Sequence, residues 1–229
     1  MTETAPLEAV LFDMDGTVID TEPLWFKYET EYVTQHGQHW SEEDAMGLVG
    51  ASARVTTKAL RERAGTDASH EEILDFLTGH IRDEILTGGA PWRRGILDLL
   101  ATLKGHSIPL ALVTSSPPNM ADALVSRLPE GTFDAVVTSK SVTAHKPSPE
   151  PYLKAAQMLG VDPARCVVLE DSISGIESAL GAGTHPIAIP CMVDLPPRPG
   201  QSRVASAEDL TWEALQQIAA GTPIDLLAN

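Results

Sequence analysis

Cysteine is almost absent from this sequence, whose 229 residues include only Cys166 and Cys191. Two cysteines cannot build a disulfide framework, and both lie in apolar stretches, so we expect buried free thiols in a reducing compartment. No apolar run approaches the length of a membrane span, and the acidic first residues carry no positively charged region of the kind that begins a leader peptide. We therefore expect a cytoplasmic protein.

Basic residues are also scarce, with 16 Lys and Arg against 32 Asp and Glu, so the formal net charge is −16. A surface this negative repels phosphate backbones and anionic lipid headgroups, so we expect neither nucleic acids nor membranes as partners. An anionic ligand would need a local concentration of Lys and Arg or a bound metal ion. Hydrophobic residues make up 43% of the chain, which is enough for a packed core and argues against global disorder.

Short apolar runs alternate with helical patterns from residue 110 onward, and a similar run lies near the N-terminus. This alternation predicts an α/β fold, in which right-handed crossovers build a parallel sheet covered by helices. Asp194–Gly200 is rich in proline and predicts a surface loop. The expected strands are Ala9–Phe12, Leu110–Thr114, Ala135–Thr138, Val167–Glu170 and Pro186–Ile189, and the expected helices are Met120–Leu128, Pro151–Leu159 and Ser174–Ala182.

Residues 20–90 differ from the rest, because they show helical periodicity without a convincing strand. We therefore expect a Rossmann-like parallel-sheet core, formed by residues 1–19 and 91–229, with an inserted α-helical cap domain of residues 20–90. An insertion directly after the first strand would cover the carboxyl edge of the sheet, where open α/β folds bind ligands. The helices expected in the insertion are Leu24–Thr34, Ser52–Ala64 and Glu71–Leu86, and Gly88–Pro91 indicates a hinge.

Two carboxylates and a glycine follow the first expected strand, in the run Asp13-Met14-Asp15-Gly16-Thr17. Asp13 and Asp15 are two residues apart, so one cation could be held between a side chain and the local backbone. Gly16 allows a sharp turn, and Thr17 adds a hydroxyl group. An ordinary solvated turn after a core strand is the alternative that this motif alone leaves open.

Hydroxyl and amino groups follow the next strands. Thr114, Ser115 and Ser116 stand just before an expected helix. Hydroxyl and backbone N–H groups at such a position suit the oxygens of a phosphoryl group, although a simple capping cluster has the same composition. Lys146 also precedes a helix, where it is either a solvated residue or a cation that offsets carboxylate repulsion and holds a phosphate oxygen.

Glu170 and Asp171 end the fourth expected strand and add two more carboxylates to the same edge of the sheet. Acidic groups at close range raise one another's pKa, so a cluster of four calls for a cation. Mg²⁺ prefers such hard oxygen ligands. An acidic helix start is the alternative for this pair, but it does not explain why every strand ends in polar groups.

The order of these motifs resembles that of the haloacid dehalogenase superfamily of phosphotransferases: Asp13-x-Asp15-Gly16-Thr17, Thr114-Ser115-Ser116, Lys146-Pro147 and Glu170-Asp171. The resemblance extends from residue 9 to about residue 190. The helical insertion is similar to the small four-helix cap of the β-phosphoglucomutase-like group. Within that group, the segment Asp20–Trp25 looks like the sugar-phosphate phosphatases of the 2-deoxyglucose-6-phosphate or hexitol-phosphate type.

The resemblance implies a phosphoric monoester hydrolase with defined catalytic residues. Asp13 would be the nucleophile and form an aspartyl-phosphate, which splits the transfer into two easier displacements. Asp15 would be the general acid and base. Ser115 and Lys146 would hold the transferring phosphoryl group against its developing charge.

The same resemblance implies Mg²⁺ as the cofactor. The ion would be bound by the Asp13 carboxylate, the Asp15 backbone carbonyl and Asp171. Glu170 would bind it directly or through water.

Substrate binding is expected from Thr114 and Ser116 in the core and from Trp25 and Arg54 in the cap. Arg54 lies one place from the usual arginine of the family's cap specificity loop. Two roles of its side chain therefore have equal weight: binding the substrate, or lying in solvent at the start of a helix. For Trp25, packing between cap and core is favoured over stacking on a sugar, though one ring could do both.

A β-phosphoglucomutase-type phosphoryl transfer is the first alternative. It is weakened by Trp25, where that branch has a histidine, and by the lack of any lysine between Leu60 and Trp92. An inorganic pyrophosphatase and a non-catalytic sensor of a phosphorylated metabolite stay open, although no nucleophile or metal ligand is missing. Lys58 is the one serviceable Schiff-base lysine for a phosphonoacetaldehyde hydrolase and lacks a supporting motif. We expect a small phosphorylated substrate and a monomer or weak dimer.

Overall fold

The computed structural model describes residues 7–227, so the acidic first residues considered above lie outside the described part. Its centre is one six-stranded, all-parallel sheet with the strand order β3-β2-β1-β4-β5-β6. The predicted Rossmann-like α/β fold is confirmed, and the five predicted strands agree to within one residue at each end. The strands are β1 (Ala9–Phe12), β2 (Leu110–Val113), β3 (Ala135–Val137), β4 (Cys166–Glu170), β5 (His185–Ala188) and β6 (Ser202–Arg203).

The strand order reverses direction between β1 and β4. The chain adds β2 and β3 on one side of β1 and then crosses to place β4 on the other side. Ligand sites of open parallel sheets lie at the carboxyl ends of the strands at such a switch point. Phe12 of β1 pairs with Leu112 of β2 and Leu169 of β4, so the next residue of each strand reaches the same edge.

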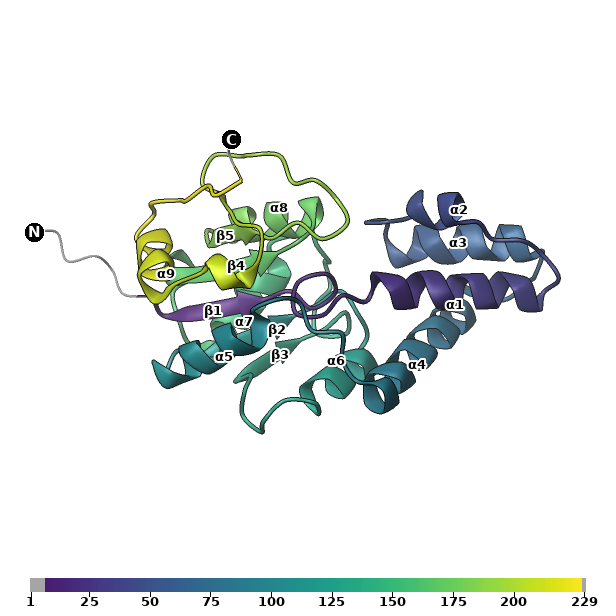
Figure 1. Ribbon diagram of the computed structural model, residues 1–229, viewed down its shortest axis with the longest axis horizontal. Coiled ribbons are helices and arrows are strands. Elements are labelled where there is room, and N and C mark those ends of the chain that lie inside the picture. Colours follow the sequence, from purple (N-terminus) through teal and green to yellow (C-terminus); the bar gives the residue numbers. More distant parts are fainter. Residues whose placement is uncertain (1–6, 228–229) are drawn as a thin grey trace, which may run out of the picture.

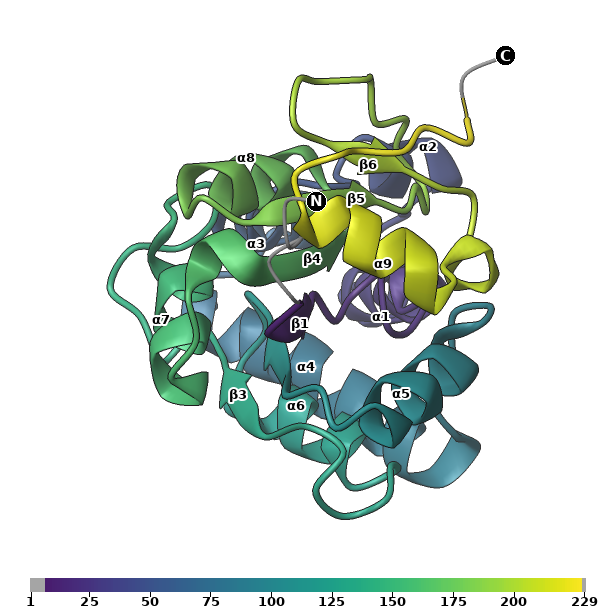
Figure 2. The ribbon, with the colours of Figure 1, turned by 90° about the vertical axis from the view of Figure 1, so that its left-hand side faces the viewer.

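Helices cover both faces of the sheet (Figure 2). Ala9 and Leu11 of β1 point into a core cluster with α7 and α8, whereas Val10 and Phe12 point to the opposite face, toward α5, α6 and α9. All four residues are fully buried, which explains the continuous apolar run of a strand covered on both sides. These helices are α5 (Ile96–Gly105), α6 (Pro118–Val125), α7 (Glu150–Leu159), α8 (Ile173–Gly181) and α9 (Trp212–Ala219).

The insertion between β1 and α5 is helical, as predicted, and extends beyond the sheet in Figure 1. Its two connecting segments run side by side: Asp20 N–H donates to Pro91 O over 2.8 Å, and Arg93 N–H donates to Val18 O over 3.0 Å. Helix α4 returns toward the core and packs against α6. The helices of the insertion are α1 (Glu22–Gln35), α2 (Glu42–Met46), α3 (Ala53–Ala64) and α4 (His70–Gly88).

Several elements were not predicted. Helix α2 is only five residues long, too short for a helical period to show in the sequence. The α5, α9 and β6 segments were not identified, and α4 runs through Gly88, into the segment predicted as a hinge. Asp194–Gly200 forms neither helix nor strand, as expected for a loop.

Both cysteines are free thiols, and Cys166 is buried in β4 as expected. The prediction that Cys191 is buried is wrong, because this residue follows β5 in a loop and is partly exposed. No helix within residues 7–227 has both the length and the apolar character needed to cross a membrane.

Candidate active site

Asp13 follows β1 at the carboxyl edge of the sheet and is 7% exposed. Its backbone N–H donates to Leu169 O of β4 over 3.0 Å, which continues the parallel pairing by one residue. Its side chain meets Lys146, whose Nζ donates to Asp13 Oδ1 over 2.6 Å. The same Nζ donates to Val113 O over 3.0 Å and to Glu170 Oε1 over 2.6 Å, so all three of its N–H groups are used. Lys146 is therefore no solvated surface residue, and its side chain is only 5% exposed.

Glu170 ends β4 and is fully buried. Besides Lys146, its Oε1 accepts a hydrogen bond from the Tyr152 hydroxyl over 2.6 Å. Its Oε2 accepts from Ser172 N–H over 3.2 Å and from Ser172 Oγ over 3.0 Å. The carboxylate lies against Gly175 of α8, where a Cβ atom would come within 1.8 Å of Glu170 Oε1. Only glycine leaves room for the carboxylate at this place.

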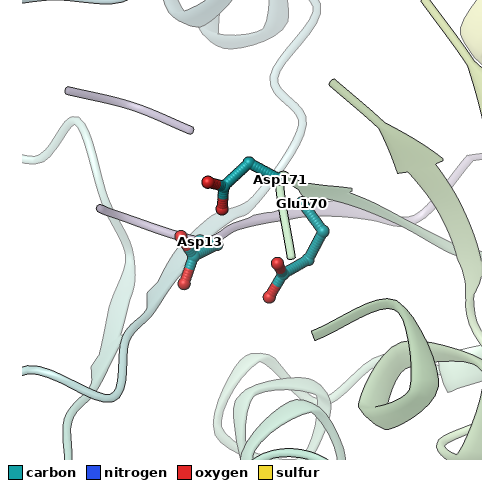
Figure 3. Close-up of side chains that lie close together, drawn as sticks. All are labelled: Asp13, Glu170 and Asp171. Atoms are coloured by element: carbon teal, nitrogen blue, oxygen red, sulfur yellow. The ribbon is translucent and has the colours of Figure 1, made fainter. Parts of the chain in front are cut away.

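Asp171 follows β4 and points back toward Asp13 (Figure 3). It lies against Gly16, and two features of this position require glycine. The φ angle of +83° is unfavourable for other residues, and a Cβ atom would lie 2.0 Å from Asp171 Oδ2. Thr17 Oγ1 donates a long hydrogen bond of 3.4 Å to Asp171 Oδ1. The turn after β1 thus forms one wall of the acidic cluster.

The carboxylates of Asp13, Glu170 and Asp171 converge, and one oxygen from each lies within 4.8 Å of the others. Burial, with additional repulsion from Glu170 and Asp15, raises the pKa of Asp13 to about 8, although Lys146 opposes the shift. Burial and the charges of Asp13 and Glu170 also raise the pKa of Asp171 well above its usual range. Burial works to lower the pKa of Lys146, but its two carboxylate neighbours raise it overall.

This donor set fits a hard divalent cation. All three groups offer carboxylate oxygens, and the single cation among them, Lys146, leaves excess negative charge in a buried place. The raised pKa values of Asp13 and Asp171 reflect that excess. An ion of charge +2 would offset the repulsion and favour the ionised carboxylates.

Asp15 accepts hydrogen bonds from three hydroxyl groups, which come from two segments of the chain. Thr21 Oγ1 donates to Asp15 Oδ1 over 2.7 Å, while Ser116 Oγ at 2.7 Å and Thr114 Oγ1 at 3.3 Å donate to Asp15 Oδ2. Ser116 N–H in turn donates to Thr114 Oγ1 over 2.9 Å. The Thr114 and Ser116 hydroxyls, predicted to bind substrate, are thus directed at Asp15 in this structure.

The remaining predicted residues lie further out. Ser115 is exposed between β2 and α6 at the same edge of the sheet. Trp25 of α1 is half-buried and packs against the main core cluster, consistent with the favoured packing role. Arg54 is exposed in the first turn of α3 and lines a cavity of about 210 Å³ together with Lys58 and Arg61.

Sequence reasoning missed four residues that position the site: Thr21, Tyr152, Ser172 and Gly175. Ser172 could have been found, because a serine followed by an apolar helical pattern is an N-cap signal, and its side chain does accept from Gly175 N–H. The other three have no local signal. Their partners lie six residues away or in another element, so only the fold brings them together.

Comparison with known proteins agrees with this arrangement. Residues 10–189 match the family described as haloacid dehalogenase-like hydrolase. The chain is 32% identical over 181 residues to fructose-1-phosphate phosphatase YqaB of Escherichia coli (strain K12), covering 79% of this chain and 95% of the relative. It is 30% identical over 210 residues to hexitol phosphatase A of the same organism, covering 91% of each.

Among solved structures, a protein described as a putative beta-phosphoglucomutase from Thermotoga maritima superposes with a TM-score of 0.70 and 28% identity, covering 96% of this chain and 94% of that one. The family predicted from the order of the four motifs is therefore confirmed, together with the β-phosphoglucomutase-like group within it. This chain belongs to the haloacid dehalogenase-like hydrolase family, as a phosphatase of the phosphoric monoester hydrolase class.

Proposed function

We propose that this enzyme is a Mg²⁺-dependent phosphatase that hydrolyses a small phosphorylated sugar or polyol through an aspartyl-phosphate on Asp13. The observation that carries the proposal is the convergence of Asp13, Glu170 and Asp171 around Lys146, beside an Asp15 held by three hydroxyl groups. A nucleophile, an acid and base, and concentrated positive charge are the groups that phosphoryl transfer requires.

In the first step a carboxylate oxygen of Asp13 attacks the phosphorus atom. The bond between phosphorus and the ester oxygen breaks, and Asp15 donates its proton to the departing alcohol. Lys146 stands 2.6 Å from Asp13 and is positioned to stabilise the charge on the phosphoryl oxygens, together with Ser115 at the same edge.

In the second step water attacks the phosphorus atom of the aspartyl-phosphate. Asp15, now a carboxylate, takes a proton from this water, and the bond between phosphorus and Asp13 breaks. Inorganic phosphate leaves, and both carboxyl groups return to their starting states. Thr114 and Ser116 support Asp15 in both roles, because their hydroxyls hold one of its oxygens.

Mg²⁺ would be held by Asp13, Asp171 and the Asp15 backbone carbonyl, and when bound it would neutralise the phosphoryl oxygens and draw them toward Asp13. Glu170 would bind the ion directly or through water, and either contact would replace one of the four hydrogen bonds that its two oxygens accept.

We further propose that residues 20–90 act as a separate cap domain on a core of residues 1–19 and 91–229. The paired connections at residues 18–20 and 91–93 would form its hinge. Closure of such a cap would exclude bulk water and complete the substrate site. Trp25 and Arg54 would then contribute to specificity from the cap side.

The substrate class is inferred from similarity. One relative is named for fructose 1-phosphate and another for hexitol phosphates, and each covers most of this chain. The net charge of −16 opposes an anionic ligand in general, so the phosphorylated metabolite would depend on Lys146 and the bound cation for its attraction to the site. We propose a cytoplasmic enzyme that acts as a monomer or weak dimer.

Phosphate release from a panel of substrates tests the proposal. The panel contains fructose 1-phosphate, sorbitol 6-phosphate, hexose 6-phosphates, nucleotides and pyrophosphate, each with Mg²⁺ and with EDTA. We expect Mg²⁺-dependent release from sugar or polyol phosphates, abolished in Asp13→Asn and unchanged in Asp98→Asn, an exposed residue of α5. Release that persists in EDTA, or activity near wild type in Asp13→Asn, would refute the mechanism.

A mutase is the second candidate, because one similar structure is described as a putative beta-phosphoglucomutase. β-Glucose 1-phosphate with trace glucose 1,6-bisphosphate discriminates between the two. Glucose 6-phosphate formation without phosphate release would identify a mutase. Release from pyrophosphate alone would identify a pyrophosphatase, and binding without turnover across the panel would favour the sensor.

A further inference from the structure

Tyr152 lies behind the active site and has no part in the mechanism described above. It sits near the start of α7, with its side chain fully buried between the helix and the sheet. Its hydroxyl donates to Glu170 Oε1 over 2.6 Å, and its ring centroid lies 5.1 Å from Lys146 Nζ. Burial and the charge of Glu170 raise the pKa of Tyr152 well above its usual range, so the phenol keeps its proton and acts as the donor.

Both carboxylate oxygens of Glu170 accept hydrogen bonds. Tyr152 and Lys146 donate to Oε1, and two groups of Ser172 donate to Oε2. A carboxylate offers about four acceptor positions, and these donors fill them. Gly175 adjoins the same carboxylate so closely that a Cβ atom on it would lie 1.8 Å from Oε1 and 2.1 Å from Oε2. The Glu170 side chain is therefore held in one orientation, and Tyr152 is the neutral donor on the side that faces Lys146.

That orientation is transmitted to Asp13. Lys146 divides its three N–H groups among Glu170, Asp13 and Val113 O, so a displacement of Glu170 changes where the ammonium group lies relative to Asp13. Without the Tyr152 hydroxyl, Oε1 would keep only Lys146 as a donor and would draw it away from Asp13. A phenylalanine would fill the same space, so packing alone does not account for a hydroxyl at this buried place.

We propose that Tyr152 is a positioning residue for phosphoryl transfer, whose hydroxyl orients Glu170 and, through it, the Lys146 ammonium group next to Asp13. The inference rests on the proposed function where it is tested by enzyme activity. The second test, the affinity for Mg²⁺, does not depend on turnover. Outer residues that hold metal-site groups typically change metal affinity or activity by about 10- to 100-fold when removed.

Tyr152→Phe tests the inference in the full chain. We expect kcat to fall by about 10- to 100-fold and KM for the sugar phosphate to stay within about twofold, while the Mg²⁺ dissociation constant rises about tenfold by calorimetry. Tyr32→Phe, which alters a buried tyrosine of the insertion, is the matched control and should change none of these values.

A double-mutant cycle with Glu170→Gln separates positioning from packing. If Tyr152 acts through Glu170, the double variant loses little more kcat than Glu170→Gln alone. If the losses of kcat in the two single variants add fully in the double variant, the inference is overturned. It is also overturned if Tyr152→Phe keeps the wild-type kcat and Mg²⁺ affinity, even if its melting temperature is lower. If the wild type releases no phosphate from any substrate, the proposed function fails, and the Mg²⁺ titration still decides the role of Tyr152.

Discussion

Thr21 Oγ1 donates a 2.7 Å hydrogen bond to Asp15 Oδ1, and this bond joins the helical insertion to the candidate acid and base of the core. Thr21 is the N-cap residue of α1, and its carbonyl accepts from Leu24 N–H and Trp25 N–H in the first turn. Both the side chain and the backbone of this buried residue are therefore engaged. Any movement of α1 relative to the core changes the contact that holds Asp15.

Thr21→Val should therefore impair catalysis without removing a reacting group. Hydrogen bonds to charged groups contribute about 1.5–3 kcal/mol, so we expect kcat to fall by roughly tenfold or more. Thr21→Ser keeps the hydroxyl and should retain most of the activity. Steady-state kinetics on the best substrate check this, and equal kcat values in the valine and serine variants would show that the contact has no catalytic role.

Gly175→Ala should inactivate the enzyme through Glu170. Gly175 has ordinary helical backbone, so alanine is strained there only by the overlap of its Cβ atom, 1.8 Å from Glu170 Oε1. We expect activity to drop by about 100-fold or more, because Glu170 must leave its hydrogen bonds. Gly79→Ala in α4 is the control: its Cβ atom would meet nothing within 4 Å, and it should stabilise the fold by about 0.5–1 kcal/mol. Normal activity in Gly175→Ala would contradict the assignment of Glu170.

Arg54→Ala should change substrate preference more than the chemical step. Arg54 is exposed in the first turn of α3, and no ion pair involving it occurs within residues 7–227. We expect the ratio of kcat/KM between two sugar phosphates to shift several-fold, while pH dependence and Mg²⁺ requirement stay the same. Arg127→Ala, an exposed arginine of the core, controls for the loss of charge. Unchanged rates on every substrate would remove Arg54 from the substrate site.

Glu29→Gln should change the pH dependence of stability. Glu29 is buried in α1, and burial, reinforced by Glu22, raises its pKa from 4.5 to about 7. The folded state then holds a proton that the unfolded state releases between these two values, so the free energy of unfolding falls as pH rises through this window. Glutamine cannot titrate, so the variant should gain on the order of 3 kcal/mol over wild type between pH 4 and pH 8.

Urea unfolding of both proteins at a series of pH values measures this gain. Glu31→Gln, an exposed neighbour on the same helix, should follow the wild-type curve. A constant difference between Glu29→Gln and wild type at every pH would mean that Glu29 does not titrate in this window.

The sequence predicted the core of this protein well because the relevant signals are local. Ala9–Phe12 is apolar at every position, as a strand buried on both faces must be, and Asp13 follows it directly. Glu170 and Asp171 mark the end of β4 similarly, because they follow an apolar run. The order of the four motifs then identified the family, which the comparisons confirm. The catalytic and metal-binding roles of these residues stay predictions.

The tertiary structure decided which of these groups touch. Thr114 and Ser116 are predicted to bind substrate, and the structure adds that their hydroxyls donate to Asp15, because β2 brings them to the same edge as the turn after β1. Tyr152 is 18 residues from Glu170 and lies on a helix that crosses behind the sheet. A hydrogen bond of that kind depends on how α7 packs, and packing leaves no mark in a local sequence pattern.

The sequence by itself determined the parallel-sheet core, the ends of its main strands and the candidate residues that follow them, because burial and turn formation act on neighbouring residues. Only the tertiary structure decided that Lys146 bridges Asp13 and Glu170, that Gly175 makes room for a carboxylate, and that Thr21 ties the insertion to Asp15. Each of these contacts joins separate elements, and its geometry exists only once helices and strands have packed into one core.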